Sequence, residues 1–181
     1  MTTYEVRPAV VEDAVRLAEV HVQVWHEAYA GIMPAEYLAG LDPTRGVEGW
    51  RRSVADPVPG AVVLVATVDG QMVGMSAAGP SRDDPPEPKH ELYAINVLAA
   101  HHGTGVAGQL FESTLAATAG DAAVSLWVLE VNARARAFYA KYGFAPDGRT
   151  KRHPPTGVVE VRLVRPAPRR GQRRAAGAPG A

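Results

Sequence analysis

Apolar residues recur at two periods along this chain, and the two periods predict different elements. Two runs rich in Val and Ala, 61–68 and 71–78, flank the dipeptide Asp69-Gly70. This dipeptide between two such runs favours a type I′ turn, which predicts an antiparallel β-hairpin. Other short runs of the same character predict strands at residues 4–7, 90–98, 123–129, 144–149 and 158–164.

A helical period separates these strands. Apolar residues three and four positions apart between residues 12 and 29 predict an amphipathic helix that ends at Gly31. A second helix is expected over 132–142, with Asn132 as its N-cap. The remaining helices are expected at 35–41, 44–54 and 107–119. Strands and helices in this order predict a mixed α/β sheet.

The composition excludes several classes of protein. With 181 residues, 46% of them hydrophobic, the chain can form a single core. No apolar run approaches the roughly 20 residues of a membrane span, and the N-terminus does not resemble a secretory signal, so we expect a cytoplasmic protein without a membrane partner. The absence of cysteine excludes disulfides and an acyl-cysteine intermediate. The histidines lack the spacing of metal ligands, and we expect no metal.

Charge is balanced overall but uneven along the chain. The chain has 19 basic and 19 acidic residues, yet residues 166–181 hold four arginines and no acid among Pro, Gly and Ala. We therefore expect one domain over residues 1–165 and a disordered tail over 166–181. Four arginines without aromatic residues are a weak nucleic-acid footprint, so we interpret the tail as solvated. The basic stretch 134–152 is likewise interpreted as a solvated face rather than as a phosphate contact.

A glycine-rich loop carries the clearest chemical signal. Gly103, Gly105 and Gly108 follow a predicted strand and open a predicted helix, where backbone N–H groups and the helix dipole favour a phosphate group. The spacing also matches the dinucleotide fingerprint GxGxxG, with Glu130 as the ribose-binding acid. However, that fingerprint follows the first strand of its domain, whereas a hairpin precedes this loop. The sequence therefore disfavours a nicotinamide site.

The loop resembles instead the signature Gln/Arg-x-x-Gly-x-Gly/Ala of the GCN5-related N-acetyltransferases, with His102 in the first position. A second block of that family, Asn-x-x-Ala/Ser-x-x-Phe-Tyr-x-x-x-Gly-Phe, is present from Asn132 to Phe144. The resemblance covers residues 3–165. It implies the acyl-CoA N-acyltransferase fold, a single α/β domain with a mixed, mostly antiparallel sheet flanked by helices.

The resemblance also implies an activity, the direct transfer of an acetyl group from the co-substrate acetyl-CoA to a primary amine. Tyr139 would then be the general acid for the thiolate, and Glu91 would take the amine proton through water. The backbone of Ile95 and Val97 would pair with the pantetheine. The other residues expected to contact acetyl-CoA are His102, Gly103, Thr104, Gly105, Val106, Ala107 and Asn132. Structural readings stay open, since Tyr139 also fits a core aromatic, Glu91 a solvated carboxylate and Asn132 a simple cap.

The acceptor is less defined. Trp25, Tyr29 and Tyr37, together with an acidic loop around Asp83, could form a pocket for a cationic amine. We expect a small-molecule amine. The alternatives are a protein N-terminal or lysine acetyltransferase that takes a peptide acceptor, and a non-catalytic acyl-CoA-binding or regulatory module. A homodimer is also expected, because dimers are common in the family.

Overall fold

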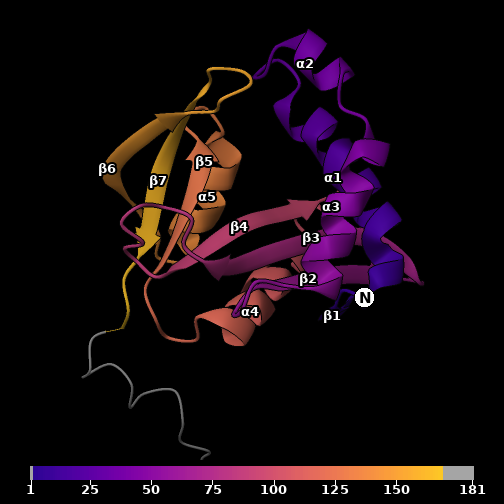
Figure 1. Cartoon of the computed structure of the whole chain (residues 1–181), viewed down its shortest axis with the longest axis horizontal. Helices are drawn as coiled ribbons and strands as arrows, with labels where there is room; N and C mark the ends of the chain where they lie inside the picture. Colours follow the sequence, from indigo (N-terminus) through magenta and orange to yellow (C-terminus); the bar gives the residue numbers. More distant parts are fainter. Residues whose placement is uncertain (1, 169–181) are drawn as a thin grey trace, which may run out of the picture.

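A seven-stranded sheet organises the chain in a computed structural model, which describes residues 2–168 (Figure 1). The spatial order is β1-β2-β3-β4-β5-β7-β6, and every neighbouring pair is antiparallel except β4 and β5. This confirms the predicted mixed, mostly antiparallel sheet. The strands are β1 (Glu5–Pro8), β2 (Val62–Val68), β3 (Gln71–Pro80), β4 (His90–Val97), β5 (Val124–Leu129), β6 (Ala145–Arg152) and β7 (Val159–Arg165).

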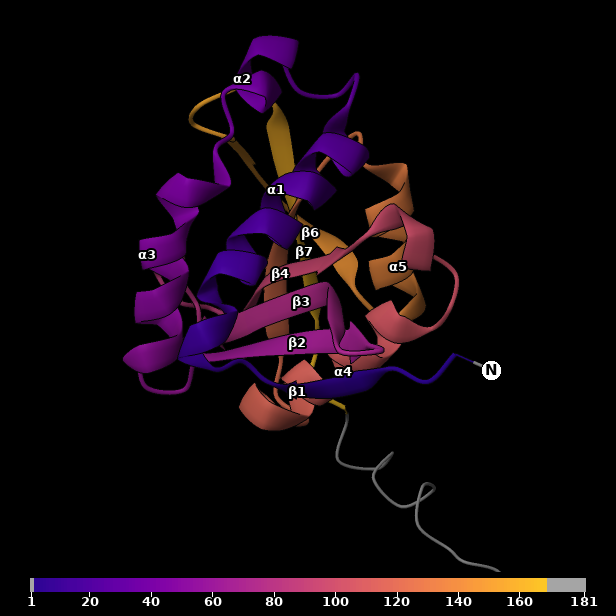
Figure 2. The same cartoon turned by 90° about the vertical axis from the view of Figure 1, so that its right-hand side faces the viewer.

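The helices cover both faces of this sheet (Figure 2). On one face, Leu17 of α1 and Val65 of β2 share a hydrophobic cluster against which Trp50 of α3 packs. On the other face, Leu110 of α4 shares a cluster with Val97 of β4. The helices are α1 (Ala14–Tyr29), α2 (Ala35–Ala39), α3 (Pro43–Ala55), α4 (Val106–Thr118) and α5 (Ala133–Lys141), with 3-10 turns at Val11–Asp13 and Ala99–His101. No helix within residues 2–168 is long and apolar enough to cross a membrane.

Local signals set the turns and caps where the sequence predicts them. Asp69 and Gly70 both have positive φ, 50° and 75°, as a type I′ turn requires. Asn132 caps α5, because its Oδ1 accepts a hydrogen bond of 3.0 Å from the amide of Ala135. The first long helix differs from its prediction, since a 3-10 turn precedes α1. The cause is Asp13, whose carboxylate accepts hydrogen bonds from the Val10 amide, at 2.8 Å, and from Arg7 of β1.

The sheet opens between β4 and β5. These strands pair only at their beginnings, His90 with Val124 and Glu91 with Ser125, and then diverge. Most of the β4 edge that faces β5 is therefore left without a neighbouring strand. The gap lies in the interior of the sheet order, with β1-β2-β3-β4 on one side and β5-β7-β6 on the other. The prediction of a disordered tail falls almost entirely on residues 169–181, which lie outside the described residues.

Candidate active site

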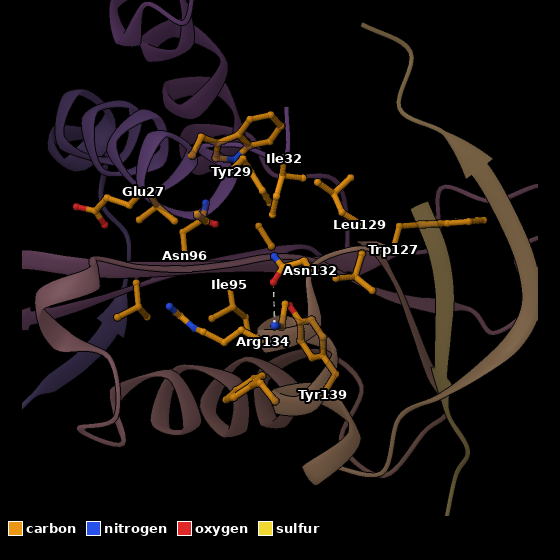
Figure 3. A pocket seen from close by; sticks show the side chains of 18 of the residues that line it. Glu27, Tyr29, Ile32, Ile95, Asn96, Trp127, Leu129, Asn132, Arg134 and Tyr139 are labelled. Carbon is orange, nitrogen blue, oxygen red and sulfur yellow. Dashed lines mark hydrogen bonds between the residues drawn. The ribbon is translucent and has the colours of Figure 1, made fainter. Parts of the chain in front are cut away.

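A cavity of about 500 Å³ lies in the gap between β4 and β5 (Figure 3). Tyr29 and Asn96 reach it from the side of α1, whereas Ile95, Arg134 and Tyr139 lie on the side of α4 and α5. The cavity thus extends through the sheet at the point where the strands part. The divergence of β4 and β5 gives two separate faces of the sheet access to one space.

The glycine loop forms the end of this cavity at the N-terminus of α4. Gly103 and Gly105 have φ values of 76° and 93°, and a Cβ atom at either position would enter open space. The amides of residues 103–107 have no hydrogen-bond acceptor within residues 2–168. The amide of His102, in contrast, donates to the Ala99 carbonyl at 3.1 Å. The free amides and the positive end of the α4 dipole are suited to a phosphate group, and they begin at Gly103 rather than at His102.

The side chain of His102 links three elements. Its Nε2 lies 2.9 Å from the Val97 carbonyl oxygen, and its Nδ1 lies 2.7 Å from Nη1 of Arg134. A carbonyl can only accept and a guanidinium can only donate, so this imidazole is neutral and carries its proton on Nε2. His102 therefore holds the Arg134 guanidinium beside the glycine loop. Arg134 lines the cavity, which corrects the interpretation of this part of the basic stretch as a solvated face.

The free edge of β4 contains both residues expected to pair with pantetheine. The Leu98 amide donates to the Val73 carbonyl of β3, so the polar groups of Val97 face the opposite edge. Ile95, two residues earlier, shares that edge. Both residues line the cavity. An extended ligand could add to β4 here as a further strand.

Tyr139 reaches the cavity from α5 and is supported by aromatic packing. Its ring lies 5.4 Å from the Phe138 ring and 5.9 Å from the Phe144 ring, measured between centroids. Burial raises the pKa of the Tyr139 phenol far above its ordinary value, and the neighbouring Tyr29 adds to the effect. The hydroxyl is therefore protonated at neutral pH and can donate a proton. Tyr29 is buried too, which raises its pKa, as does the charge of Glu160.

Asn132 stands between these two tyrosines in the cavity wall. Besides capping α5, its side chain forms a hydrogen bond with Tyr29, which opposes the rise in the pKa of that phenol. The cap and this bond explain its position, and its predicted contact with acetyl-CoA stays a prediction. The structure thus brings together the predicted residues of the glycine loop, Ile95, Val97, Asn132, Tyr29 and Tyr139.

Glu91 is not brought into this group. Its side chain is 1% exposed and does not line the cavity. Arg82 surrounds the carboxylate, since its amide donates to Oε2 at 2.8 Å and its Nε and Nη2 both donate to Oε1. This geometry favours a structural role for Glu91, which fixes the loop before β4. Its predicted role as the base is not supported by position.

Aromatic side chains form the α1 end of the cavity. The Trp25 ring lies 5.2 Å from the Tyr29 ring, and His153 of the β6–β7 turn lies 5.9 Å from both Trp25 and Tyr37. Trp25, Tyr29 and His153 line the cavity, and Tyr37 packs behind them. The acidic loop does not complete this pocket, because Asp83 is bound to Arg162 and to Nε1 of Trp127 instead.

The sequence did not single out two polar residues of the wall. Asn96 of β4 and His21 of α1 lie in contact, with Nδ2 of Asn96 3.0 Å from Nδ1 of His21. Burial lowers the pKa of His21, so its imidazole is neutral at pH 7. The two are 75 residues apart, and neither lies in a recognisable motif. Within residues 2–168 no three His, Cys, Asp or Glu side chains are grouped so that they could hold a metal ion.

Comparisons with known proteins agree with this arrangement. A family model described as an acetyltransferase (GNAT) domain matches residues 59–146. A probable N-acetyltransferase of Mycobacterium tuberculosis is 31% identical over 174 residues, which is 90% of this chain and 95% of that protein. An uncharacterized N-acetyltransferase of Mycobacterium bovis is 33% identical over 141 residues, covering 75% of this chain and 85% of that protein.

A solved structure has the same fold. The PaiA N-acetyltransferase of Thermoplasma acidophilum, in complex with coenzyme A, superposes with a TM-score of 0.72 at 19% identity, over 91% of this chain and 99% of the other. The antiparallel strands that precede the glycine loop, and this shared fold, replace the dinucleotide interpretation. By its identity to relatives that it covers over most of their length, and by its fold, the chain belongs to the GCN5-related N-acetyltransferase family.

Proposed function

We propose that this chain transfers an acetyl group from acetyl-CoA directly to a primary amine of a small molecule. The observation that carries the proposal is the set of free amides at residues 103–107, which open into the same cavity as Tyr139. The space beside Gly103 and Gly105 has room for a group that approaches the backbone closely. That a neighbour of the same fold was solved with coenzyme A supports the choice of donor.

The residues of the chain fit each part of this co-substrate. Amides 103–107 would hold the diphosphate, with the dipole of α4 and the Arg134 guanidinium adding positive potential. The β4 edge at Ile95 and Val97 would hold the pantetheine by strand-like pairing. The thioester would then lie in the gap between β4 and β5, where Tyr139 and Asn96 face the cavity.

Acetyl-CoA supplies an activated acetyl thioester, and the chain supplies position and a proton. The amine nitrogen forms a bond to the carbonyl carbon, and the carbon–sulfur bond breaks. The Tyr139 hydroxyl donates its proton to the departing sulfur, a role suited to a phenol whose raised pKa keeps it protonated. The amine loses its own proton to cavity water. Since Arg82 holds Glu91 away from the cavity, we assign Glu91 no part in that transfer.

The size and chemistry of the acceptor end favour a small amine. Cavities of about 500 Å³ are typical of small-molecule sites. Trp25 and Tyr29 present ring faces that attract a cationic amine before it loses its proton. A peptide acceptor and a non-catalytic acyl-CoA-binding module are the alternatives, and the experiment below separates them. A cytoplasmic location and a homodimeric state stay predictions.

One experiment tests the proposal. Purified protein is titrated with acetyl-CoA and, for comparison, with NAD, by calorimetry. Thiol release is then measured with amines, amino acids, and peptides with a free N-terminus or an internal lysine. We expect acetyl-CoA binding without NAD binding, and thiol release with small amines above that with peptides. Acetyl-CoA binding without thiol release from any acceptor would favour the non-catalytic module, and NAD binding alone would refute the donor assignment.

A further inference from the structure

A second cavity adjoins the first on the α1 and α3 side of the sheet. It has a volume of about 650 Å³ and lies between α3, the segment after α3, and strands β2, β3 and β4. His21, Tyr93 and Ala94 line both cavities, so the two spaces meet at these residues. A bulge in β4 explains the contact. Ala77 pairs with Ala94 and Ala78 pairs with Leu92, which leaves Tyr93 without a partner in β3.

Arg82 presents a planar guanidinium to this second cavity. Its Nε and Nη2 bind Oε1 of Glu91, and its guanidinium carbon lies 4.2 Å from the centroid of the Tyr93 ring. Within residues 2–168, Nη1 has no hydrogen-bond partner, and 60% of the side chain is exposed. Arg82 is thus fixed at one edge and along one face, while its Nη1 donors remain available. A guanidinium held in this way is suited to bind a carboxylate.

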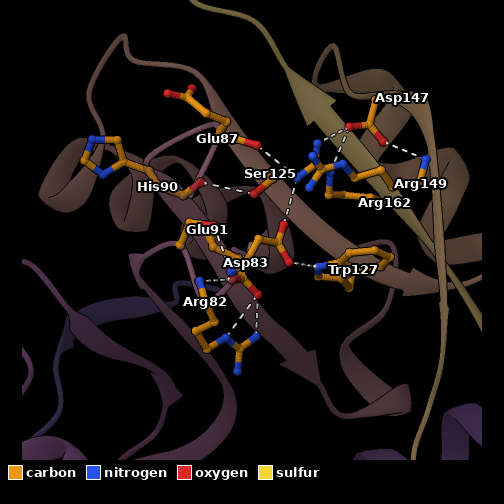
Figure 4. A network of polar contacts seen from close by, with 11 residues as sticks. Arg82, Asp83, Glu87, His90, Glu91, Ser125, Trp127, Asp147, Arg149 and Arg162 are labelled. Carbon is orange, nitrogen blue, oxygen red and sulfur yellow. Dashed lines mark hydrogen bonds and ion pairs between the residues drawn. The ribbon is translucent and has the colours of Figure 1, made fainter. Parts of the chain in front are cut away.

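The loop that carries Arg82 is anchored on its other side as well (Figure 4). Asp83 accepts hydrogen bonds from Nε1 of Trp127, at 3.0 Å, and from Nη1 of Arg162, at 2.8 Å. Arg162 also donates to the Glu87 carbonyl at 2.9 Å and binds the Asp147 carboxylate. Residues 82 and 83 are therefore tied to β4, β5 and β7. A binding side chain on such a loop loses little freedom when a ligand arrives.

The charges around the second cavity favour an anion with a single charge. The ionised side chains of its lining are Arg52, Arg82 and Asp56, which leaves one net positive charge. His21 adds none at neutral pH, since burial lowers its pKa. Glu91 does not line the cavity. One net positive charge matches a carboxylate better than a doubly charged phosphate, and it disfavours a second cationic group on the ligand.

We propose that the second cavity receives the far end of the acceptor, and that Arg82 selects acceptors with a carboxylate remote from the reacting amine. The amine would lie in the first cavity near His21 and Asn96, and the carboxylate would lie against Nη1 of Arg82. The inference rests on the proposed function and names its substrate class, an amino carboxylate. Arg82 is the specificity-determining residue, and Glu91 and Tyr93 position it.

The test compares two matched series of acceptors. Glycine, β-alanine, 4-aminobutanoate and 6-aminohexanoate are compared with n-alkylamines of equal chain length, by thiol release from acetyl-CoA. We expect at least one amino carboxylate to exceed its alkylamine by about 10-fold or more in kcat/KM, as a charge-assisted hydrogen bond provides. The length of the preferred member would report the span between the two cavities.

Substitutions then locate the preference at Arg82. Arg82→Gln leaves Glu91 buried and unpaired, which endangers folding, so the double variant Arg82→Gln/Glu91→Gln is made beside it. Both should reduce the ratio between the two series to about one. Arg51→Gln, the same change on an exposed arginine of α3 outside the cavity lining, should retain the ratio. Circular dichroism and thermal unfolding report whether each variant is folded.

A binding measurement separates this inference from the proposed function. Butanoate and hexanoate, which have no amine, are titrated into the parent and the double variant and followed by NMR. We expect binding to the parent and about 10-fold weaker binding to the double variant. Equal turnover of both acceptor series by the parent, or a preference that survives in the double variant, would overturn the inference. Arg82-dependent carboxylate binding without any thiol release would contradict the proposed function alone.

Discussion

Gly105→Glu tests the phosphate cradle directly. Gly105 is the N-cap of α4 and has φ of 93°, in a region that L-residues rarely adopt. A glutamate there would extend into the open space beside the free amides of residues 103–107. It would bring a negative charge to the place where the diphosphate is proposed to bind. We therefore expect a large loss of acetyl-CoA affinity in a protein that still folds.

The size of the loss follows from two separate costs. Positive φ costs an L-residue about 1–2 kcal/mol of folding free energy, and no neighbouring atom adds a clash. A carboxylate about 5 Å from one phosphate charge costs roughly 3 kcal/mol at an effective dielectric constant of about 20. That repulsion corresponds to a loss of about 100-fold in affinity. The first cost reduces stability, whereas the second reduces binding.

A matched variant separates the two costs. Gly148 in β6 has φ of 90°, no atom within 4 Å of its added Cβ, and no place in either cavity lining. Gly148→Glu should therefore reduce thermal stability as Gly105→Glu does, with acetyl-CoA affinity kept. Gly105→Gln removes the charge and should lose less affinity than Gly105→Glu. Calorimetry at low and high salt measures the charge part, which salt should screen. If Gly105→Glu binds acetyl-CoA within threefold of the parent, the cradle is refuted.

Two further substitutions address the acid and the polar network of Figure 4. Tyr139→Phe should lower kcat about 100-fold with little change in acetyl-CoA binding, because the ring still packs on Phe138; stopped-flow thiol release measures this, and an unchanged kcat would make Tyr139 a packing residue. Burial would raise the pKa values of Asp83 and Asp147, but hydrogen bonds from Arg162 outweigh it and hold both below 3.8. These pairs therefore stabilise the fold above about pH 4 and lose their contribution as pH falls. Arg162→Met should lower the free energy of unfolding by about 3 kcal/mol at pH 7 and flatten its fall in acid, as urea titrations at several pH values would report; an unchanged slope would contradict the assignment.

The parts of the fold that the sequence predicts are those with short-range causes. Asp69-Gly70 determines its turn through backbone preference alone, and Asn132 caps α5 through a bond three residues away. The glycine loop belongs to the same class, because Gly103 and Gly105 are needed for positive φ whatever surrounds them. Tyr139 was found because its helix and its family block agree.

The rest of the site depends on contacts between distant segments. His21 and Asn96 meet only because α1 lies on β4, and His102 meets Arg134 only because the sheet places α5 beside the glycine loop. Neither residue pair has a spacing that a periodic pattern could reveal. The second cavity has the same origin, since its walls come from α3 and three strands.

Glu91 illustrates how a residue type can point to the wrong role. A carboxylate at the start of a central strand beside a cavity resembles a base in sequence, and only its partners distinguish the alternatives. Arg82 lies nine residues earlier in a loop rich in proline, where no rule of spacing relates the two side chains. Once Arg82 binds it, Glu91 has too few free lone pairs to receive a proton from an amine, and it becomes the residue that orients a guanidinium. The same contact that removes Glu91 from the chemistry of the first cavity thus gives the second cavity its one fixed donor group.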